Sequence, residues 1–205
     1  MNAALSVVDR VGLEGLTIRA VAAAVRAPPM SLYSRFANKE ELLDLMYAEV
    51  AFRLYADAEH STWQGAVEAL CHQVRRVLLE HPRWVPLLSR PALPMAVPLR
   101  ERALELMTAA GMAPEDALAS LTNASLISLG LTLVELSFRG PSGASHLAER
   151  FEQLLKSTED PRFAKQHPVT RAAFARMRHL DLSRNFAGSV STLIQGLEAR
   201  LALPR

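Results

Sequence analysis

The side chains that most often perform catalysis or bind metals are few in this sequence and lie far apart. No two of the six histidines are separated by three or four residues, the spacing that places two metal ligands on one face of a helix. None lies beside Cys71, the single cysteine, so a cysteine–histidine nucleophile has no local support. Ser142 stands in a Gly-Pro-Ser-Gly loop that lacks the strand and helix around a hydrolase nucleophile. We therefore expect no enzyme, no metal and no cofactor, and enzymatic activity of the larger domain is a minor alternative.

Basic side chains gather at the N-terminal end of the chain. Residues 1–39 carry five basic and two acidic side chains, a net charge of +3, whereas the remaining residues carry 18 basic and 19 acidic ones. A positive end on a nearly neutral body suits contact with an anion, and nucleic acid is the obvious candidate.

The cellular compartment is predicted from two absences. One cysteine cannot form an internal disulfide, and no charged segment followed by an apolar one opens the chain. A cytoplasmic location follows. The most apolar stretch, residues 117–138, is interrupted by serine, threonine, asparagine and glutamate, which a lipid-facing span rarely tolerates in such number. We interpret it as a buried helix rather than a membrane span and expect no membrane partner.

The elements that position these side chains are predicted to be helices throughout. Aromatic residues make up 6% of the chain, and apolar residues recur at spacings of three and four rather than in alternation. With 205 residues, half of them apolar, the chain is long enough for a sizeable core. The sequence predicts an all-α protein with a small domain over residues 1–46 and a larger one over residues 47–205.

Capping residues and prolines set the expected helix boundaries. Thr17 is a good N-cap, Pro28 fixes a turn, and Asn38 with Glu41 three residues later is a variant of the capping box. The predicted helices are a first one that ends at Gly12, then residues 18–25, 30–36, 38–58, 63–80, 99–110, 114–139, 145–156, 168–180 and 183–203, with a loosely packed polar stretch over 157–167. The first three fit a helix-turn-helix module, although a purely structural role is also open.

Three motifs in this module carry a family resemblance. Residues 15–22 (GLTIRAVA), 31–36 (SLYSRF) and 38–43 (NKEELL) resemble the N-terminal domain of the tetracycline-repressor (TetR) family of transcriptional regulators. Residues 104–135 and 186–198 are similar to the ligand-binding domain of its tetracycline-type members. The resemblance implies an all-helical homodimeric repressor that binds palindromic operator DNA and that a small molecule releases. A helical protein–protein adaptor without specific DNA binding is the alternative.

The resemblance also implies which residues contact DNA. They are Thr17, Arg19, Pro29, Met30, Ser31, Tyr33, Arg35 and Lys39. A hydroxyl, a phenol and an ammonium group around one such module fix its register on phosphates, while an arginine can pair with guanine. Tyr33 could instead be half-buried core, and Lys39 a solvated residue of the first helical turn.

Two residues depart from the family pattern. Arg26 occupies the turn position that is usually glycine, so either the turn has another shape or Arg26 carries left-handed strain. Pro28 replaces the usual serine cap of the recognition helix. Pro29 and Met30 offer bases little beyond apolar contact with thymine methyl groups.

The larger domain is expected to hold an apolar effector between its helices. Candidate ligand contacts are Tyr55, Trp63, Leu70, Trp84, Leu87, Leu88, Met107, Asn123 and Ile127. Ordinary core packing is the alternative for each, although Asn123 and Trp84 are costly to bury without partners. Tetracycline binders of the family use histidine and asparagine around a magnesium-bound drug, and Tyr55 and Leu70 stand at matching places here, so a metal-free effector is expected.

The last helix carries a broad apolar stripe that predicts a dimer interface. The expected interface residues are Leu133, Phe186, Val190, Leu193, Leu197 and Leu201. Together with the apolar positions of residues 126–138, they would form a four-helix contact across a two-fold axis. Burial against the chain's own core is the alternative.

Overall fold

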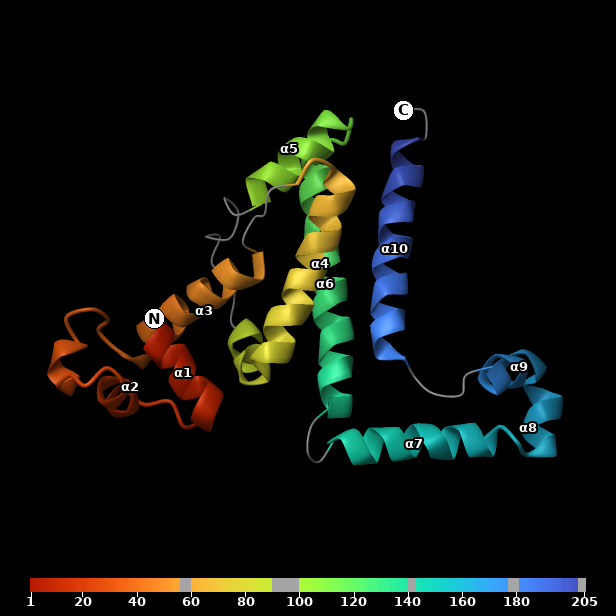
Figure 1. Ribbon diagram of the computed structural model, residues 1–205, viewed down its shortest axis with the longest axis horizontal. Coiled ribbons are helices and arrows are strands. Elements are labelled where there is room, and N and C mark those ends of the chain that lie inside the picture. The colour runs from red at the N-terminus through yellow and green to blue at the C-terminus, as the bar shows by residue number, and fades with distance from the viewer. Residues whose placement is uncertain (56–59, 90–99, 140–142, 177–180, 203–205) are drawn as a thin grey trace.

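The computed structural model describes residues 1–55, 60–89, 100–139, 143–176 and 181–202, and within these ranges every regular element is a helix. In chain order they are α1 (Asn2–Val11), α2 (Ile18–Ala24), η1 (Pro29–Ser31), α3 (Lys39–Tyr55), α4 (Trp63–Glu80), η2 (Pro82–Ser89), α5 (Glu101–Ala109), α6 (Pro114–Arg139), α7 (Gly143–Ser157), α8 (Pro161–Gln166), α9 (Pro168–Arg176) and α10 (Leu182–Leu201). The all-α prediction is confirmed. In Figure 1, α1, α2 and η1 form a small group beside α3. We call these four elements the head. Helices α4, α6 and α10 pack together in the larger part of the molecule, which we call the body.

Capping bonds begin the helices where the sequence predicts them. The Thr17 hydroxyl accepts a hydrogen bond from the Ala20 N–H at 3.1 Å. The Asn38 side chain accepts one from the Glu41 N–H at 2.9 Å, and the Glu41 carboxylate accepts one from the Ala37 N–H at 2.6 Å. Each bond satisfies a backbone donor that the first helical turn leaves free. Helices α4 and α6 also begin and end at the predicted residues.

The stretch over residues 157–167 differs from its prediction. It contains the short helix α8, which the sequence analysis did not predict, and no residue of α8 is buried. The Asp160 carboxylate accepts a hydrogen bond from the Arg162 N–H at 2.7 Å, and Pro161 takes the first helical position, where no N–H is needed. In Figure 1, α7 leads away from the end of α6 toward α8 and α9. The predicted helical residues 56–58, 99, 177–180 and 203 lie outside the described residues.

Two clusters of buried apolar side chains form the core. The head cluster joins the head to the body, because Leu5 of α1 and Met46 of α3 lie in it together with Val77 of α4 and Trp84 of η2. The body cluster consists of residues from α4, α5, α6 and α10, together with Met112. Leu70 of α4 packs against both clusters, and α6 also contacts both, with Leu136 against the head cluster and Leu121 in the body cluster.

Helix α6 buries many polar side chains beside Ala117, Leu121 and Ala124, and it exposes several large apolar ones. Its buried polar residues are Ser120, Ser125, Ser128, Thr132 and Glu135. Each of the four hydroxyls donates to the carbonyl four residues earlier, at 2.7 to 2.8 Å, so the helix itself satisfies them. Leu126 and Val134, by contrast, are 60% and 48% exposed. Among the described helices, α6 is also the one long and apolar enough to cross a membrane by length and composition, a test that core helices of soluble proteins pass as well.

Candidate nucleic-acid interface and ligand site

The polar residues predicted to contact DNA lie on the outer surface of the head. Thr17, Arg19, Tyr33 and Lys39 are all exposed. Tyr33 is 46% exposed and belongs to neither core cluster. The Thr17 side chain both caps α2 and remains at the surface, where its helix end favours an anion. These four side chains are therefore placed where phosphates and base edges could reach them.

The segment after Pro28 is shorter than the predicted recognition helix over residues 30–36. Helix η1 covers only Pro29–Ser31, and turns follow it. Pro28 supplies no side-chain cap, as predicted. The Ser31 and Ser34 hydroxyls donate to the carbonyls of Pro28 and Ser31 at 2.7 and 2.8 Å, and such local bonds compete with a regular helix.

The turn before η1 carries strained backbone. Arg26 has a φ of 54°, the left-handed conformation that favours glycine. Of the two possibilities for this position, the structure has the strained arginine. Left-handed backbone costs about 1–2 kcal/mol for a residue with a side chain. The remaining predicted contact residues Pro29, Met30, Ser31 and Arg35 are exposed, and Met30 reaches 77% exposure.

A group of charged and aromatic side chains joins α1 to η2. His81 Nδ1 lies 3.0 Å from a carboxylate oxygen of Asp9, and Arg83 donates to the Asp9 backbone carbonyl at 3.3 Å. The His81 ring stacks on the Trp84 ring with centroids 3.8 Å apart, and the Arg53 guanidinium carbon lies 5.2 Å from the Trp84 centroid. This junction is not predictable from the sequence, because 72 residues separate Asp9 from His81 and no local pattern connects them.

The predicted effector residues are divided between the two core clusters and the surface. Tyr55, Trp84, Leu87 and Leu88 contribute to the head cluster, Trp63 and Met107 to the body cluster, and Leu70 to both. Asn123 and Ile127 instead lie on the exposed side of α6, with Ile127 39% exposed, so neither belongs to a buried cluster of this chain. Their sequence positions place them on the apolar outer face that α6 leaves uncovered.

Two buried donors near the head cluster have no hydrogen-bond partner within the described part of the chain. Trp84 is 1% exposed, and its indole N–H is unpaired. Arg100 has an unpaired Nε–H, and its guanidinium carbon lies 4.4 Å from the centroid of the Tyr55 ring. Burial raises the pKa of Tyr55, although the Arg100 charge acts in the opposite direction. An unpaired buried donor costs about 1–3 kcal/mol, so this region favours a bound acceptor. Arg100 gave no signal in the sequence.

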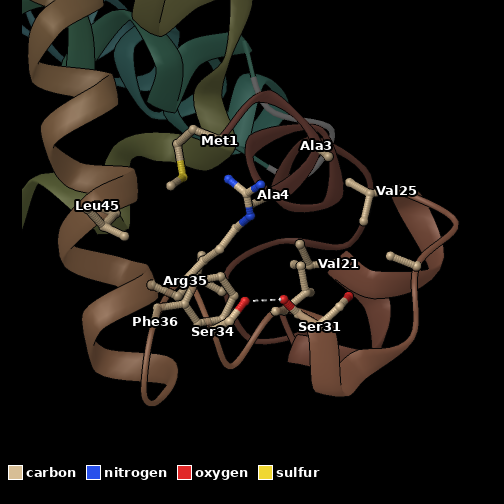
Figure 2. A pocket seen from close by; sticks show the side chains of 13 residues that line it. Met1, Ala3, Ala4, Val21, Val25, Ser31, Ser34, Arg35, Phe36 and Leu45 are labelled. Carbon is tan, nitrogen blue, oxygen red and sulfur yellow. Dashed lines mark hydrogen bonds between the residues drawn. The ribbon is translucent and has the colours of Figure 1, made fainter.

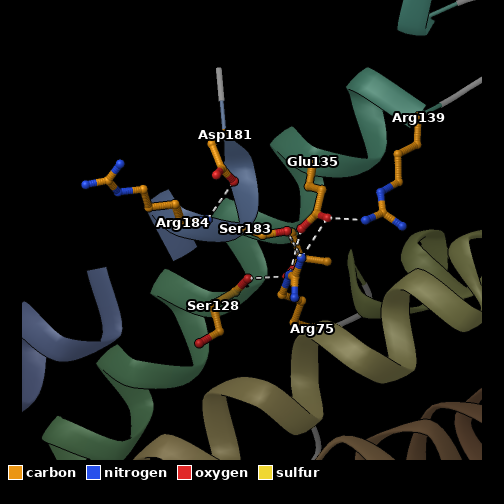
Figure 3. Close-up of polar contacts among 8 residues, drawn as sticks. Arg75, Ser128, Glu135, Arg139, Asp181, Ser183 and Arg184 are labelled. Atoms are coloured by element: carbon orange, nitrogen blue, oxygen red, sulfur yellow. Dashed lines mark hydrogen bonds and ion pairs between the residues drawn. The ribbon is translucent and has the colours of Figure 1, made fainter. Parts of the chain in front are cut away.

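Glu135 is buried in an ion-pair network rather than facing solvent or a dimer partner (Figure 3). It is 3% exposed, and Arg75 donates to its two oxygens at 2.7 and 2.8 Å. Arg139 donates to it at 2.5 Å, and Arg75 also reaches the Ser183 hydroxyl at 2.9 Å. Burial by itself would raise the pKa of Glu135, but the hydrogen bond and charge of Arg75, with those of Arg139, hold it below its usual value. The network links α4, α6 and α10.

The apolar stripe predicted as a dimer interface faces the chain's own core along much of its length. Phe186, Val190 and Leu197 are 2%, 3% and 8% exposed. The partly buried Leu193 and Leu201 pack against the same body cluster. The alternative of internal burial is therefore correct for this face of α10, whereas Leu133 on α6 stays half-buried.

The described residues contain no cluster of metal-binding side chains. No set of three or more histidine, cysteine, aspartate or glutamate side chains among them is placed to hold a metal ion. Cys71 is buried, and burial raises the pKa of its thiol, so the reactive thiolate form is disfavoured.

Family models match nearly the whole chain. The model described as "Bacterial regulatory proteins, tetR family" matches residues 1–46, and the one described as "Tetracyclin repressor-like, C-terminal domain" matches residues 56–201.

Individual relatives agree with this match. An HTH-type transcriptional regulator of Saccharopolyspora erythraea is 30% identical over 82% of this chain and 73% of its own length. The repressor DrrR1 of Streptomyces coeruleorubidus is 34% identical over 59% of this chain, and the match spans 46% of DrrR1. The structure of ActR from Streptomyces coelicolor in complex with actinorhodin superposes with a TM-score of 0.77 at 27% identity, covering 98% of this chain and 96% of ActR.

Proposed function

Because the chain belongs to the TetR family of bacterial regulatory proteins, we propose that it binds palindromic operator DNA as a homodimer, represses transcription, and leaves the DNA when a small effector binds. The observation that carries this proposal is the exposed set of Thr17, Arg19, Tyr33 and Lys39 on one helix-turn-helix head. Family members regulate transcription, and we assign this chain no catalysis and a cytoplasmic location. Residues 1–46 would read DNA, and residues 47–205 would bind the effector and the partner subunit.

The DNA-contact roles can be separated by salt dependence. Lys39→Ala removes a phosphate contact, so it should lower the salt slope of binding by about one unit and weaken all sequences alike. Arg19→Ala should in addition relax the preference at one base pair, with a cost of about 1–3 kcal/mol at that position. Fluorescence anisotropy on an operator selected from random duplexes measures both effects.

Arg76→Ala is the matched control, because Arg76 is an exposed arginine of α4 paired with Glu80 at 3.0 Å. It should leave operator binding unchanged. If Lys39→Ala and Arg19→Ala both bind the selected operator like the parent protein, the proposed contacts are wrong. If the protein binds no duplex DNA of any sequence, the result would favour the alternative that it is a protein–protein adaptor.

The dimer interface is proposed to include the exposed apolar face of α6. Leu126 and Val134 are exposed there although the helix buries many polar side chains. An apolar stripe of this kind is usually covered by a partner. Leu126→Glu should therefore convert the dimer to a folded monomer in analytical ultracentrifugation. Phe52→Glu, which alters an apolar residue of α3 that is 52% exposed, is the control and should remain dimeric. An unchanged dimer mass for Leu126→Glu would exclude this face.

The effector is proposed to be an apolar, metal-free molecule that carries a hydrogen-bond acceptor. Trp84 and Arg100 supply buried donors that lack partners, and Tyr55 lies under the Arg100 guanidinium. A ligand that satisfies these donors in the DNA-incompetent state would shift the equilibrium by its differential affinity, about 1–3 kcal/mol. The acceptor refines the apolar or weakly polar effector expected from composition.

A thermal-shift screen of apolar acceptor-bearing compounds, run with and without a chelator, would test this proposal. Trp84→Phe removes the donor but keeps an aromatic ring, so it should weaken a hit about tenfold. Trp63→Phe, at a tryptophan that is 6% exposed in the body cluster, is the control and should bind the hit normally. Equal affinity of both variants, or release from the operator that needs magnesium, would contradict the proposal.

A further inference from the structure

The head contains an open cavity of about 650 Å³ (Figure 2). It lies between α1, α2, the turn after η1 and α3, and none of the proposed effector residues lines it. The side chains of Ala4, Val21 and Leu42 form its buried apolar walls. Val25 and Leu45 line it and are 44% and 40% exposed. Its volume falls in the range of about 300–1,000 Å³ that is usual for small-molecule sites.

Arg35 supplies the positive charge of this cavity. Its side chain lines the cavity and extends toward the beginning of α1, near Met1 and Ala4 (Figure 2). No acidic side chain of the described residues is paired with Arg35. The hydroxyls of the lining serines Ser31 and Ser34 donate to backbone carbonyls, so their protons are already engaged. Among the lining side chains, the guanidinium of Arg35 is thus the uncommitted donor.

We propose that this cavity binds a small amphipathic molecule with an apolar body and a single carboxylate. The apolar walls would exclude a strongly polar ligand, because burying its polar groups without partners is costly. The Arg35 guanidinium would pair with the carboxylate, for which its planar set of donors is suited. The cavity is separate from the effector site proposed for the body, so its binding does not rest on that site.

A carboxylate bound in this cavity would compete with DNA for the head. This consequence rests on the proposed function. Arg35 and Ser31 line the cavity and also belong to the proposed DNA contacts. A carboxylate held by Arg35 would neutralise a charge that phosphate otherwise uses, and like charges of ligand and DNA would repel. The head would then respond to such a molecule directly, without transmission from the body.

Decanoate, below its micelle concentration, is the probe for the first test. Titration into the full chain, followed by methyl NMR, should shift the signals of Val21, Val25 and Leu45. Arg35→Gln should weaken decanoate about fivefold, the effect of losing a partly exposed charge pair. Leu45→Trp places a larger side chain at the mouth of the cavity and should abolish the shifts. Both changes are at exposed positions, so the variants should fold.

Two controls separate the cavity from general charge effects. Arg10→Gln lowers the head charge equally, and Arg10, an exposed residue of α1 outside the cavity, donates to the Ser6 carbonyl at 3.4 Å. This variant should bind decanoate like the parent protein. Decyltrimethylammonium, which carries the opposite charge on the same chain, should cause no shifts in the head. Shifts confined to the body, equal affinity of Arg35→Gln, or equal binding of the cation would overturn the proposal.

A DNA measurement then tests the competition. Decanoate should lower the affinity of the native protein for duplex DNA and leave that of Leu45→Trp unaltered, each compared with its own affinity without decanoate. If decanoate binds the cavity and DNA affinity does not change, the competition is wrong while the cavity site stands. If no DNA is bound under any condition, the proposed regulatory function fails, and the NMR result still decides the cavity.

Discussion

The head cluster and the body cluster differ in what they hold together. The head cluster combines residues of α1, α2 and α3 with Val77 of α4 and Trp84 of η2, so the head shares its core with the body. The body cluster is built from α4, α5, α6 and α10 together with Met112, and it contains no residue of the head. A change in the position of η2 would therefore alter the packing of the DNA-reading end directly.

Truncating a buried side chain in each cluster should give the largest loss of stability, and the two losses should differ most clearly in where the protein opens. Trp84→Ala removes a side chain that is 1% exposed in the head cluster and should cost about 3–5 kcal/mol of unfolding free energy. Met107→Ala, at a fully buried position of the body cluster, should cost about 2–5 kcal/mol. Native-state hydrogen exchange should show selective loss of protection in α1 and α2 for Trp84→Ala. Equal loss in the head for both variants would contradict the distinction between the clusters.

Removing the buried charge of Glu135 in the body should give the second-largest loss of stability. Glu135→Gln leaves Arg75 without its carboxylate and should cost about 2–3 kcal/mol in urea unfolding at neutral pH. Glu80→Gln is the matched control, because Glu80 forms a surface pair with Arg76 and is 52% exposed. It should change stability by about 0.5 kcal/mol or less. A similar cost for both would mean that burial of Glu135 adds nothing.

The same network should make stability depend on pH. The folded pKa of Glu135 lies below its ordinary value of 4.5, so the folded state favours the ionised carboxylate. Its stabilising contribution is complete above about pH 4.5 and is lost as the pH falls through the folded pKa. Thermal unfolding between pH 3 and 7 should therefore decline less steeply on the acid side for Glu135→Gln than for the parent protein. Parallel curves would exclude this role.

The junction between α1 and η2 should contribute less to the free energy of unfolding than the Glu135 network does. Asp9 and His81 are each about one-third exposed, with side-chain exposures of 32% and 31%, so their pair should contribute about 0.5–1 kcal/mol. A double-mutant cycle of Asp9→Asn and His81→Gln in unfolding isolates this interaction from the stacking of His81 on Trp84. A coupling energy of zero would show that the Asp9–His81 pair adds nothing to the stability of this junction.

Relief of the strained turn should have the smallest effect. Arg26→Gly removes left-handed strain but increases the freedom of the unfolded chain, and the net gain in stability should be about 0.5 kcal/mol. Arg26→Ala removes the same charge and keeps the strain, so it should give no gain. Equal stability of the two variants would mean that the turn is not strained by its side chain.

The sequence by itself determined the features that depend on neighbours within one or two helical turns. The Thr17 and Asn38 caps and the bounds of α4 and α6 were all predictable, because capping bonds and helical periodicity are local. The proline turn was predictable as well. The length of η1 was not, since Ser31 and Ser34 could bond either within a helix or to nearby carbonyls.

Only the tertiary structure decided what each helical face packs against. Periodicity indicates that Phe186 and Leu197 belong to a buried stripe, but it cannot distinguish the chain's own core from a second subunit, because both bury apolar area equally well. The polar side chains of α6 could turn inward because its hydroxyls bond within the helix and because Arg75, on another helix, reaches Glu135. The charge of Glu135 can be buried only where that distant partner is provided, and the fold alone brings the two residues together.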